Sequence, residues 1–298
     1  MSDYLLSLLL GIIEGLTEFL PISSTAHLRI AQALLNVDLE NGYWKMYTVV
    51  IQLGAILSLP VYFARRIRAF LASFPGGERG DRTWLTHPLS LTLVGFTLTA
   101  APAFLLTRII GQNLESLTVM GASLVLGGVV MWLVDASMSP YEKAGPGAPS
   151  SRIRTWHMEE MTLAQAAWIG LCQVLAAVFP GTSRAMATIA GGQIAGMSRA
   201  AALEFSFFLS MPTMAAAAGY DLMKTLFGGA ENPLGPAQID AHGWMVLALG
   251  FFVSFVVAYG TVAWLMSWVR RHGLVPFAVY RIVFGGVVLA WAAGWVSF

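Results

Sequence analysis

The chain has little charge and almost no cysteine. Of its 298 residues only 11% are charged and 57% are hydrophobic, whereas about 25% of an average soluble domain is charged. The single cysteine, Cys172, excludes an intrachain disulfide, and a net charge of +1 offers no bulk attraction for nucleic acid. The sequence also has no P-loop, no HExxH pair and no CxxC pair. This composition is typical of a polytopic helical membrane protein.

Ten apolar segments follow one another along the chain, and they differ in length. Because a helix needs about 20 residues to cross a bilayer, the longer segments predict about six full transmembrane helices, over residues 46–63, 88–107, 116–134, 200–220, 244–269 and 276–298. The other four are short and form two pairs, 4–20 with 24–36 and 163–179 with 184–197, broken at Pro21 and Pro180. We expect each pair to be a re-entrant hairpin of two half-helices in an all-α membrane protein.

The two broken pairs look like copies of one motif. When residues 14–27 are laid over 173–184, Pro21 matches Pro180 and Ser24 matches Ser183, and the same offset pairs Gly11 with Gly170 just before them. Short, interrupted segments in corresponding positions of two halves are the sign of an inverted-topology repeat with a binding site near the midplane. We therefore predict a single integral membrane domain over 1–298, with a first repeat over about 1–134, a loop over 135–160 and a second repeat over about 161–298.

Lysine and arginine gather on one side when the chain is threaded alternately through a membrane. That side receives Arg65, Arg66, Arg68, Arg79, Arg82, Lys143, Arg152, Arg154, Arg199, Arg270 and Arg271. The positive-inside rule makes it the cytoplasm, so both termini lie outside and the two hairpins enter from opposite sides. Arg281, near the start of the last segment, is expected to extend its charge outward to the cytoplasmic face.

Glu14 and Glu18 lie one helical turn apart, on the same face of the first short segment. Neighbouring carboxylates repel each other in apolar surroundings, and a divalent cation such as Mg²⁺ or Ca²⁺ between them would relieve the repulsion. The alternative is a pair of protonated or solvated glutamates at a helix end. Neither residue is near a predicted interface, which favours a functional role.

Hydroxyl groups open the second half-helix of each hairpin: Ser23, Ser24 and Thr25 in the first copy, and Thr182 and Ser183 after Gly181 in the second. One hydroxyl would serve as a helix N-cap, but three in a row exceed what capping needs. A helix start also offers free N–H donors and a partial positive charge, which suit a phosphate. If the hairpin tips meet, two helix N-termini converge on one point.

His27 and Arg184 complete the set of candidate site residues. His27 is three residues past Ser24 on the same helical face, so it is a candidate general base to Ser24, nucleophile or acid for the leaving group. The alternative is a satisfied core histidine. Arg184 lies at the second tip, and its guanidinium matches phosphate oxygens, with a salt bridge to Glu14 or Glu18 when the site is empty. Gln52 and Glu204 are candidates for supporting groups or for inter-helix hydrogen bonds.

An anion trap, two acids, a hydroxyl and an imidazole inside a membrane suit the hydrolysis of a phosphate ester or anhydride on a lipid. The main rival is a transporter of a polyprenyl phosphate, since secondary transporters use inverted repeats with broken helices. A transporter needs the anion trap but no nucleophile or base, so the Ser24–His27 and Glu14–Glu18 pairs favour the enzyme. A non-catalytic scaffold would leave the buried charges unexplained.

At these residues the chain resembles the undecaprenyl-diphosphate phosphatase family, the bacitracin-resistance type of bacterial integral membrane enzyme. The stretch from Glu14 to His27 is similar to that family's first signature, and Pro180-Gly-Thr-Ser-Arg184 is similar to its second. Length and segment pattern agree over nearly the whole chain. The chain departs from the family at Ala26, where glycine is frequent, and at Ala185-Met186, where Ser-Gly is common.

The resemblance implies removal of the terminal phosphate from undecaprenyl diphosphate, which recycles the lipid carrier of peptidoglycan synthesis and is linked to antibiotic resistance. It implies an outward-facing site in the bacterial cytoplasmic (inner) membrane, a divalent cation, an interdigitated inverted repeat and often a homodimer. Carried over by position, the resemblance implies that Glu14 and Glu18 are an acidic pair for metal or proton transfer. It implies that Ser24 is the candidate nucleophile and His27 its base or acid. It also implies that Thr25 and Ser183 contact phosphate and that Arg184 clamps it. It leaves open which of Ser24 and His27 attacks phosphorus.

Overall fold

The computed structural model describes residues 1–37, 42–106, 116–149, 151–227 and 239–295, without the side chains of 224–227. In these ranges every regular element is a helix, apart from an isolated bridge between Thr155 and Met197. Within the described ranges six helices are long and apolar enough to cross a membrane: α3 (Gly42–Tyr62), α5 (Pro88–Leu105), α7 (Leu117–Ala144), α10 (Arg199–Phe227), α11 (Ala241–His272) and α12 (Val275–Ala292). The prediction of an all-α polytopic membrane protein is confirmed.

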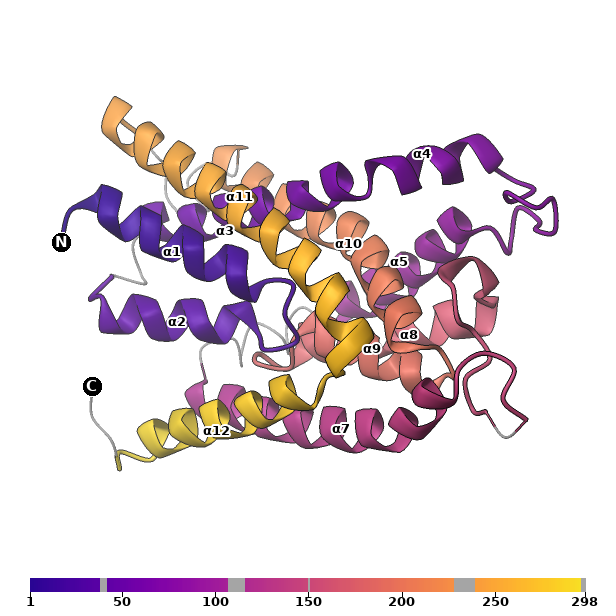
Figure 1. Ribbon diagram of the computed structural model, residues 1–298. Helices are drawn as coiled ribbons and strands as arrows, with labels where there is room; N and C mark the ends of the chain where they lie inside the picture. The colour runs from indigo at the N-terminus through magenta and orange to yellow at the C-terminus, as the bar shows by residue number, and fades with distance from the viewer. Residues whose placement is uncertain (38–41, 107–115, 150, 228–238, 296–298) are drawn as a thin grey trace.

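The four short apolar segments of the sequence are helices that form two hairpins, one from α1 (Asp3–Thr17) and α2 (Ser24–Leu34), the other from α8 (Leu163–Val178) and α9 (Arg184–Ile194). The α1–α2 hairpin opens toward the end of the molecule that carries the N-terminus (Figure 1). The α8–α9 hairpin opens at the other end, where the Ser198 N–H bonds the Thr155 carbonyl at 2.8 Å. The hairpins therefore enter the bundle from opposite ends, and their re-entry within a bilayer stays a prediction.

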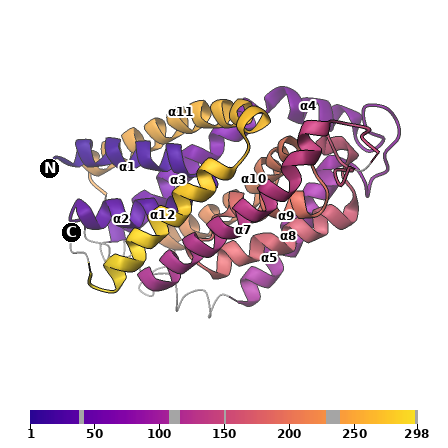
Figure 2. The same cartoon turned by 60° about the horizontal axis from the view of Figure 1, so that its bottom comes forward.

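Helices of the two halves exchange partners. In the first hairpin α1 packs against α11, and in the second α8 packs against α5. A glycine allows each close approach: a Cβ at Gly11 would lie 2.9 Å from the Gly250 carbonyl oxygen, and one at Gly170 would lie 2.5 Å from that of Gly95. The α7 and α12 helices run side by side (Figure 2). This exchange is what an interdigitated inverted repeat predicts.

The α7 helix continues beyond the predicted start of the connecting loop at residue 135. It ends at Ala144, where Gly145 has a φ of 77°, so the irregular connector begins there. Asp135, which would break an apolar span, is only 1% exposed. It accepts hydrogen bonds from Arg199 Nε at 2.6 Å and from the Leu274 N–H at 3.0 Å. These hydrogen bonds offset the cost of burying the Asp135 carboxylate, so the helix continues past this residue.

A helix that the sequence pattern did not predict, α4 (Ala64–Ser73), follows α3 within the arginine-rich loop. Its Phe70 is buried at 1% exposure. On the same helix Arg66 donates to Glu204 at 2.7 Å and pairs with Glu159 of the short 3-10 helix η1 (Met158–Glu160). This ion-pair network ties α4 to α10 and η1, so Glu204 serves an inter-helix contact rather than the site.

Candidate active site

Each hairpin tip ends in a serine with a left-handed backbone. Ser23 has a φ of 74° and Ser183 a φ of 68°, and they immediately precede the first helical residues, Ser24 and Arg184. Such conformations cost a non-glycine residue about 1–3 kcal/mol and gather at functional sites. The structure therefore pairs Ser23 with Ser183, and the sequence match of Ser24 with Ser183 is displaced by one residue. The second copy has one residue more between its helix glycine and its tip serine.

Glu18 joins the two tips. Its Oε2 accepts a hydrogen bond from the Ser24 hydroxyl, and its Oε1 accepts one from the Arg184 guanidinium. The Glu18 side chain is 1% exposed and that of Arg184 is 27% exposed. The ion pair is thus largely withdrawn from water, where Coulomb attraction is stronger than at a surface. The expected salt bridge between Arg184 and one of the two glutamates is present.

A polar cavity of about 110 Å³ lies between the tips. Its lining comes from both hairpins and from α3: Glu18, Ser23, Ser24, Thr25, Gln52, Ala176, Ala177, Pro180, Gly181, Ser183 and Arg184. The first N–H groups of α2 and α9 have no acceptors within their own helices, and helix N-termini carry a partial positive charge. Two helix N-termini and one guanidinium therefore converge on the cavity, an arrangement that suits a phosphate.

Capping uses the hydroxyls of the two tips differently. Ser183 caps α9, since its Oγ accepts from the Met186 N–H at 3.4 Å. Ser23 makes no side-chain bond to α2, and the Ser24 hydroxyl is bonded to Glu18. The first-tip hydroxyls are therefore not consumed by capping. Thr182, a predicted substrate contact, is buried at 8% exposure and lies outside the cavity lining.

Glu14 lies one turn before Glu18, fully buried at 0% exposure. Neither of its carboxylate oxygens has a hydrogen-bond partner among the described residues. A buried carboxylate left so is costly, and a cation or a proton would relieve the cost. No group of three His, Cys, Asp or Glu side chains that could hold a metal occurs in the described ranges. The unpartnered oxygens of Glu14, one turn from Glu18, are compatible with a cation between the two carboxylates, although Glu14 does not itself line the cavity.

His27 lies outside the cavity lining, against α12. Its Nδ1 is 2.7 Å from the Ser23 carbonyl oxygen and its Nε2 is 2.7 Å from the Tyr280 hydroxyl, while its ring stacks on Phe284 at 4.3 Å between centroids. Because a carbonyl only accepts, Nδ1 carries the proton and Nε2 accepts from Tyr280. The expectation that His27 serves Ser24 as a base finds no support in these contacts. Glu18 holds the Ser24 hydroxyl, and His27 holds the backbone of the tip.

Two further residues reach the site. Gln52, in the middle of α3, lines the cavity, and its signal in the sequence is an amide at the centre of an apolar segment. Arg281 was expected to extend outward, and this is wrong: it is 0% exposed and donates to the carbonyl oxygens of Pro21 and Gly181. The Arg281 guanidinium fits inside the bundle because Gly127 of α7, which lies against it, has no side chain. Nothing in the apolar pattern of α12 indicates that direction.

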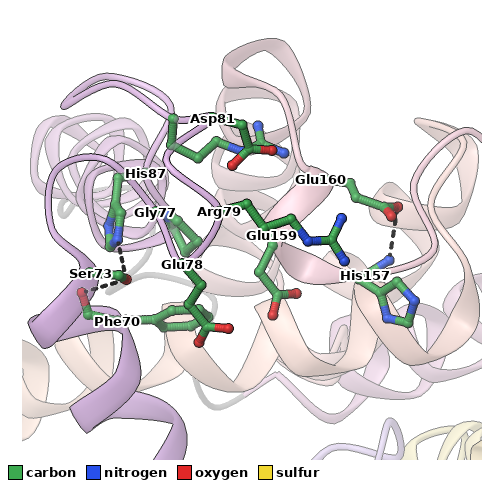
Figure 3. Close-up of a pocket in the computed structure, with 12 residues that line it drawn as sticks. Phe70, Ser73, Gly77, Glu78, Arg79, Asp81, His87, His157, Glu159 and Glu160 are labelled. Atoms are coloured by element: carbon green, nitrogen blue, oxygen red, sulfur yellow. Dashed lines mark hydrogen bonds between the residues drawn. The ribbon is translucent and has the colours of Figure 1, made fainter.

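A second cavity, of about 200 Å³, lies at the end of the molecule away from the N-terminus, beside α4 and η1 (Figure 3). Its lining mixes both signs of charge, with Arg79 and Arg82 beside Glu78, Asp81 and Glu159. None of the predicted site residues lines it. The cavity between the tips is therefore the candidate active site.

Comparison with known proteins matches residues 7–287 to the family described as bacitracin resistance protein BacA. An undecaprenyl-diphosphatase of Koribacter versatilis (strain Ellin345) is 60% identical over 98% of this chain and 99% of its own. An undecaprenyl-diphosphatase of Thermus thermophilus is 40% identical over 94% of each chain, and undecaprenyl-diphosphatase 2 of Paramagnetospirillum magneticum is 39% identical over 95% of this chain and 96% of its own. Because the family match includes both tips and these relatives align over nearly their full length, this chain belongs to the bacitracin resistance protein BacA family.

Proposed function

We propose that this chain is an undecaprenyl-diphosphatase, which hydrolyses undecaprenyl diphosphate to undecaprenyl phosphate and inorganic phosphate. Relatives of that name align with it over almost its whole length. The observation that carries the proposal is the Glu18 carboxylate, which holds the Ser24 hydroxyl on one side and the Arg184 guanidinium on the other. A nucleophile, a base and a cation in one polar cavity are what phosphoryl transfer requires.

The diphosphate of the lipid binds in the cavity between the tips. Backbone N–H groups at the starts of α2 and α9 donate to the phosphate oxygens, and the Gln52 amide lies within the same lining. Arg184 exchanges Glu18 for the phosphate, because its planar fork binds two phosphate oxygens at once. This exchange leaves Glu18 free to accept the proton of the Ser24 hydroxyl, to which it is already bonded.

Ser24 Oγ attacks the terminal phosphorus while Glu18 takes the hydroxyl proton. The bond between that phosphorus and the bridging oxygen breaks, and its electron pair leaves with undecaprenyl phosphate, which receives the proton from Glu18. Water then attacks the phosphoserine, and Glu18 accepts a proton from the water. As the phosphorus–Oγ bond breaks, Glu18 returns that proton to Ser24 and inorganic phosphate departs.

A divalent cation, Mg²⁺ or Ca²⁺, belongs to this proposal, with Glu14 and Glu18 as its protein ligands. The two unpartnered oxygens of Glu14 support it, because a buried carboxylate without donors needs a positive neighbour. When bound, the cation would neutralise charge on the phosphate oxygens. The Glu14 carboxylate would then serve the cation, and the Glu18 carboxylate would serve both the cation and the proton.

We further propose that the protein lies in the bacterial cytoplasmic membrane, with the polyprenyl chain of its substrate among the surrounding lipids. The distribution of arginine and lysine supports an orientation with both termini outside and the loops after α4 and α7 inside. The cavity then serves substrate from the outer side. A second copy of the chain is the protein partner that the family resemblance suggests.

Release of phosphate from undecaprenyl diphosphate by the purified protein tests the proposal. The wild type should release phosphate with Mg²⁺ or Ca²⁺ present, and Ser24→Ala should lower kcat by about three orders of magnitude or more. Ser58→Ala is a matched control, because Ser58 is a buried serine of α3 whose hydroxyl bonds the Ala55 carbonyl, outside the cavity. A wild-type protein that carries a polyprenyl phosphate across vesicles but releases no phosphate would be a transporter, and the proposal would fail.

A further inference from the structure

Arg281 is a fully buried cation without an anionic partner. It is 0% exposed, and no carboxylate of the described residues forms a salt bridge with it. Its guanidinium donates instead to three backbone carbonyl oxygens: Nη1 to Pro21, and Nη2 to Gly181 and Ser123, each at 3.1 Å. A buried guanidinium is costly, so the chain holds this charge inside for contacts that a neutral side chain would not make.

Two of these carbonyls occupy the same place in the two hairpin tips. Pro21 stands two residues before Ser23, and Gly181 stands two residues before Ser183, the paired serines with left-handed backbones. A single guanidinium therefore bridges the corresponding points of both tips. The third carbonyl, of Ser123, belongs to α7 and anchors that bridge to a long helix.

The guanidinium lies close against Gly127 of α7. A Cβ at Gly127 of α7 would lie 2.4 Å from Arg281 Nη2 and 2.7 Å from the terminal methyl carbon of Met186. Gly181, whose carbonyl oxygen accepts from Arg281, has a φ of 90° and packs against the backbone of Met120, where a Cβ would lie 2.4 Å from the carbonyl oxygen. The bare backbone of Gly127 therefore makes room for the fork, and the three carbonyl acceptors fix its position.

We propose that Arg281 is a positioning residue that sets the spacing between the two tips, and thereby places Arg184 of one tip against Glu18 and Ser24 of the other. The inference rests on the proposed hydrolysis of a lipid diphosphate, whose terminal phosphate must contact both tips at once. The planar fork is essential, because it presents donors to separate acceptors at a fixed angle, whereas the point charge of a lysine does not.

Arg281→Lys tests the role of the fork while it keeps the charge. We expect kcat to fall by about 10- to 100-fold and KM to change by less than about threefold, since a displacement of about 1 Å between reacting groups can cost about 10²-fold. Arg199→Lys is the control, because Arg199 is also a poorly exposed arginine, but it bonds Asp135, near the far end of α9. Both variants should lower the melting temperature, and only the change at Arg281 should lower kcat.

Gly127→Ala approaches the same contact without replacing the arginine. The new methyl group must displace a guanidinium held by three hydrogen bonds, so kcat should fall as it does in Arg281→Lys. Gly286→Ala is the matched control, because a Cβ at Gly286 of α12 would meet nothing within 4 Å. If Arg281→Lys and Gly127→Ala each keep the kcat of their controls per folded molecule, Arg281 has only a structural role and the inference is overturned.

Hydrogen–deuterium exchange separates this inference from the proposed function. Arg281→Lys should raise exchange at both tips together, over residues 18–25 and 181–186, whereas Arg199→Lys should leave both unchanged. This result would support the positioning role even if the wild type released no phosphate, in which case only the proposed function would fail. Exchange that rises at one tip alone, or at neither, would overturn the bridge.

Discussion

Glu14 and Glu18 differ in their partners, although they share a residue type and lie one turn apart. The oxygens of Glu18 hold Ser24 and Arg184, whereas those of Glu14 hold no described side chain or backbone group. A carboxylate already bonded to a hydroxyl can take its proton, and an unpartnered one is available to a cation. We infer that Glu18 serves chiefly the proton and Glu14 chiefly the metal.

Glutamine variants test this division. Glu18→Gln removes the base, so kcat should fall by about three orders of magnitude at every cation concentration. Glu14→Gln should raise the Mg²⁺ concentration for half-maximal rate by about 10- to 100-fold, with a smaller fall in kcat at saturating cation. Phosphate release across a Mg²⁺ titration measures both. Equal, mild effects of the two variants would refute separate roles.

The sequence predicts which buried charged side chains need a partner, but not the direction in which each side chain points. A guanidinium inside a membrane requires an anion, so the pairing of Arg184 with one of the two glutamates was predictable. His27 is on the expected face relative to Ser24, yet the rotation of α2 turns its ring to Tyr280 and Phe284. Arg281 points inward because of a glycine on another helix, and helical spacing carries no information about that neighbour.

The ends of helices depend on the partners of charged side chains, whereas a hydropathy pattern counts a charged residue only against an apolar segment. The apolar pattern located both hairpins and all six long helices, because in these segments burial and helix period agree. It ended α7 at Asp135 and missed α4, because a charged residue counts against a helix in that pattern. In the folded protein these charged residues form stabilising hydrogen bonds with residues far away in the sequence. Asp135 bonds Arg199, and Arg66 bonds Glu204.

His87 caps α5, and its protonation should open the start of that helix. Its Nδ1 accepts the Leu89 N–H at 3.2 Å, a bond that a protonated ring cannot accept. Burial lowers the pKa of His87 below its ordinary value of 6.5, so the folded state favours the neutral ring. The stabilisation is therefore present above about pH 6.5 and is lost as the pH falls through the lowered pKa.

Hydrogen–deuterium exchange at the start of α5, corrected for its intrinsic pH dependence, should rise as the pH is lowered from about 7.5 to about 5.5. His87→Asn should abolish this change, because asparagine caps a helix without titrating in that range. The same pH dependence in the asparagine variant would show that another group is responsible.

The whole molecule is held together by an exchange of helices between its halves. Each hairpin packs on a long helix of the other half, α1 on α11 and α8 on α5, so neither half contains its own core. The paired, broken segments predict an inverted repeat, and the exchange of helices is consistent with it. The identity of the exchanged partners was not predictable, because it depends on the close helix contacts at Gly11 and Gly170, which a hydropathy pattern does not encode.

Cysteine labelling in whole cells tests the orientation of the bundle. In a Cys172→Ser background, Ser2→Cys should react with an impermeant maleimide added outside. Arg79→Cys, in the exposed loop after α4, should react only after lysis. Labelling of Arg79→Cys in intact cells, with Ser2→Cys protected, would invert the orientation without changing the site chemistry.

In the proposed mechanism Ser24, held by Glu18, attacks phosphorus and forms a covalent intermediate. The stereochemical course at a chiral, isotopically labelled terminal phosphate of the substrate measures this directly. Attack by Ser24 followed by attack of water gives two displacements and net retention of configuration. Inversion would mean a single displacement by water and would contradict the account.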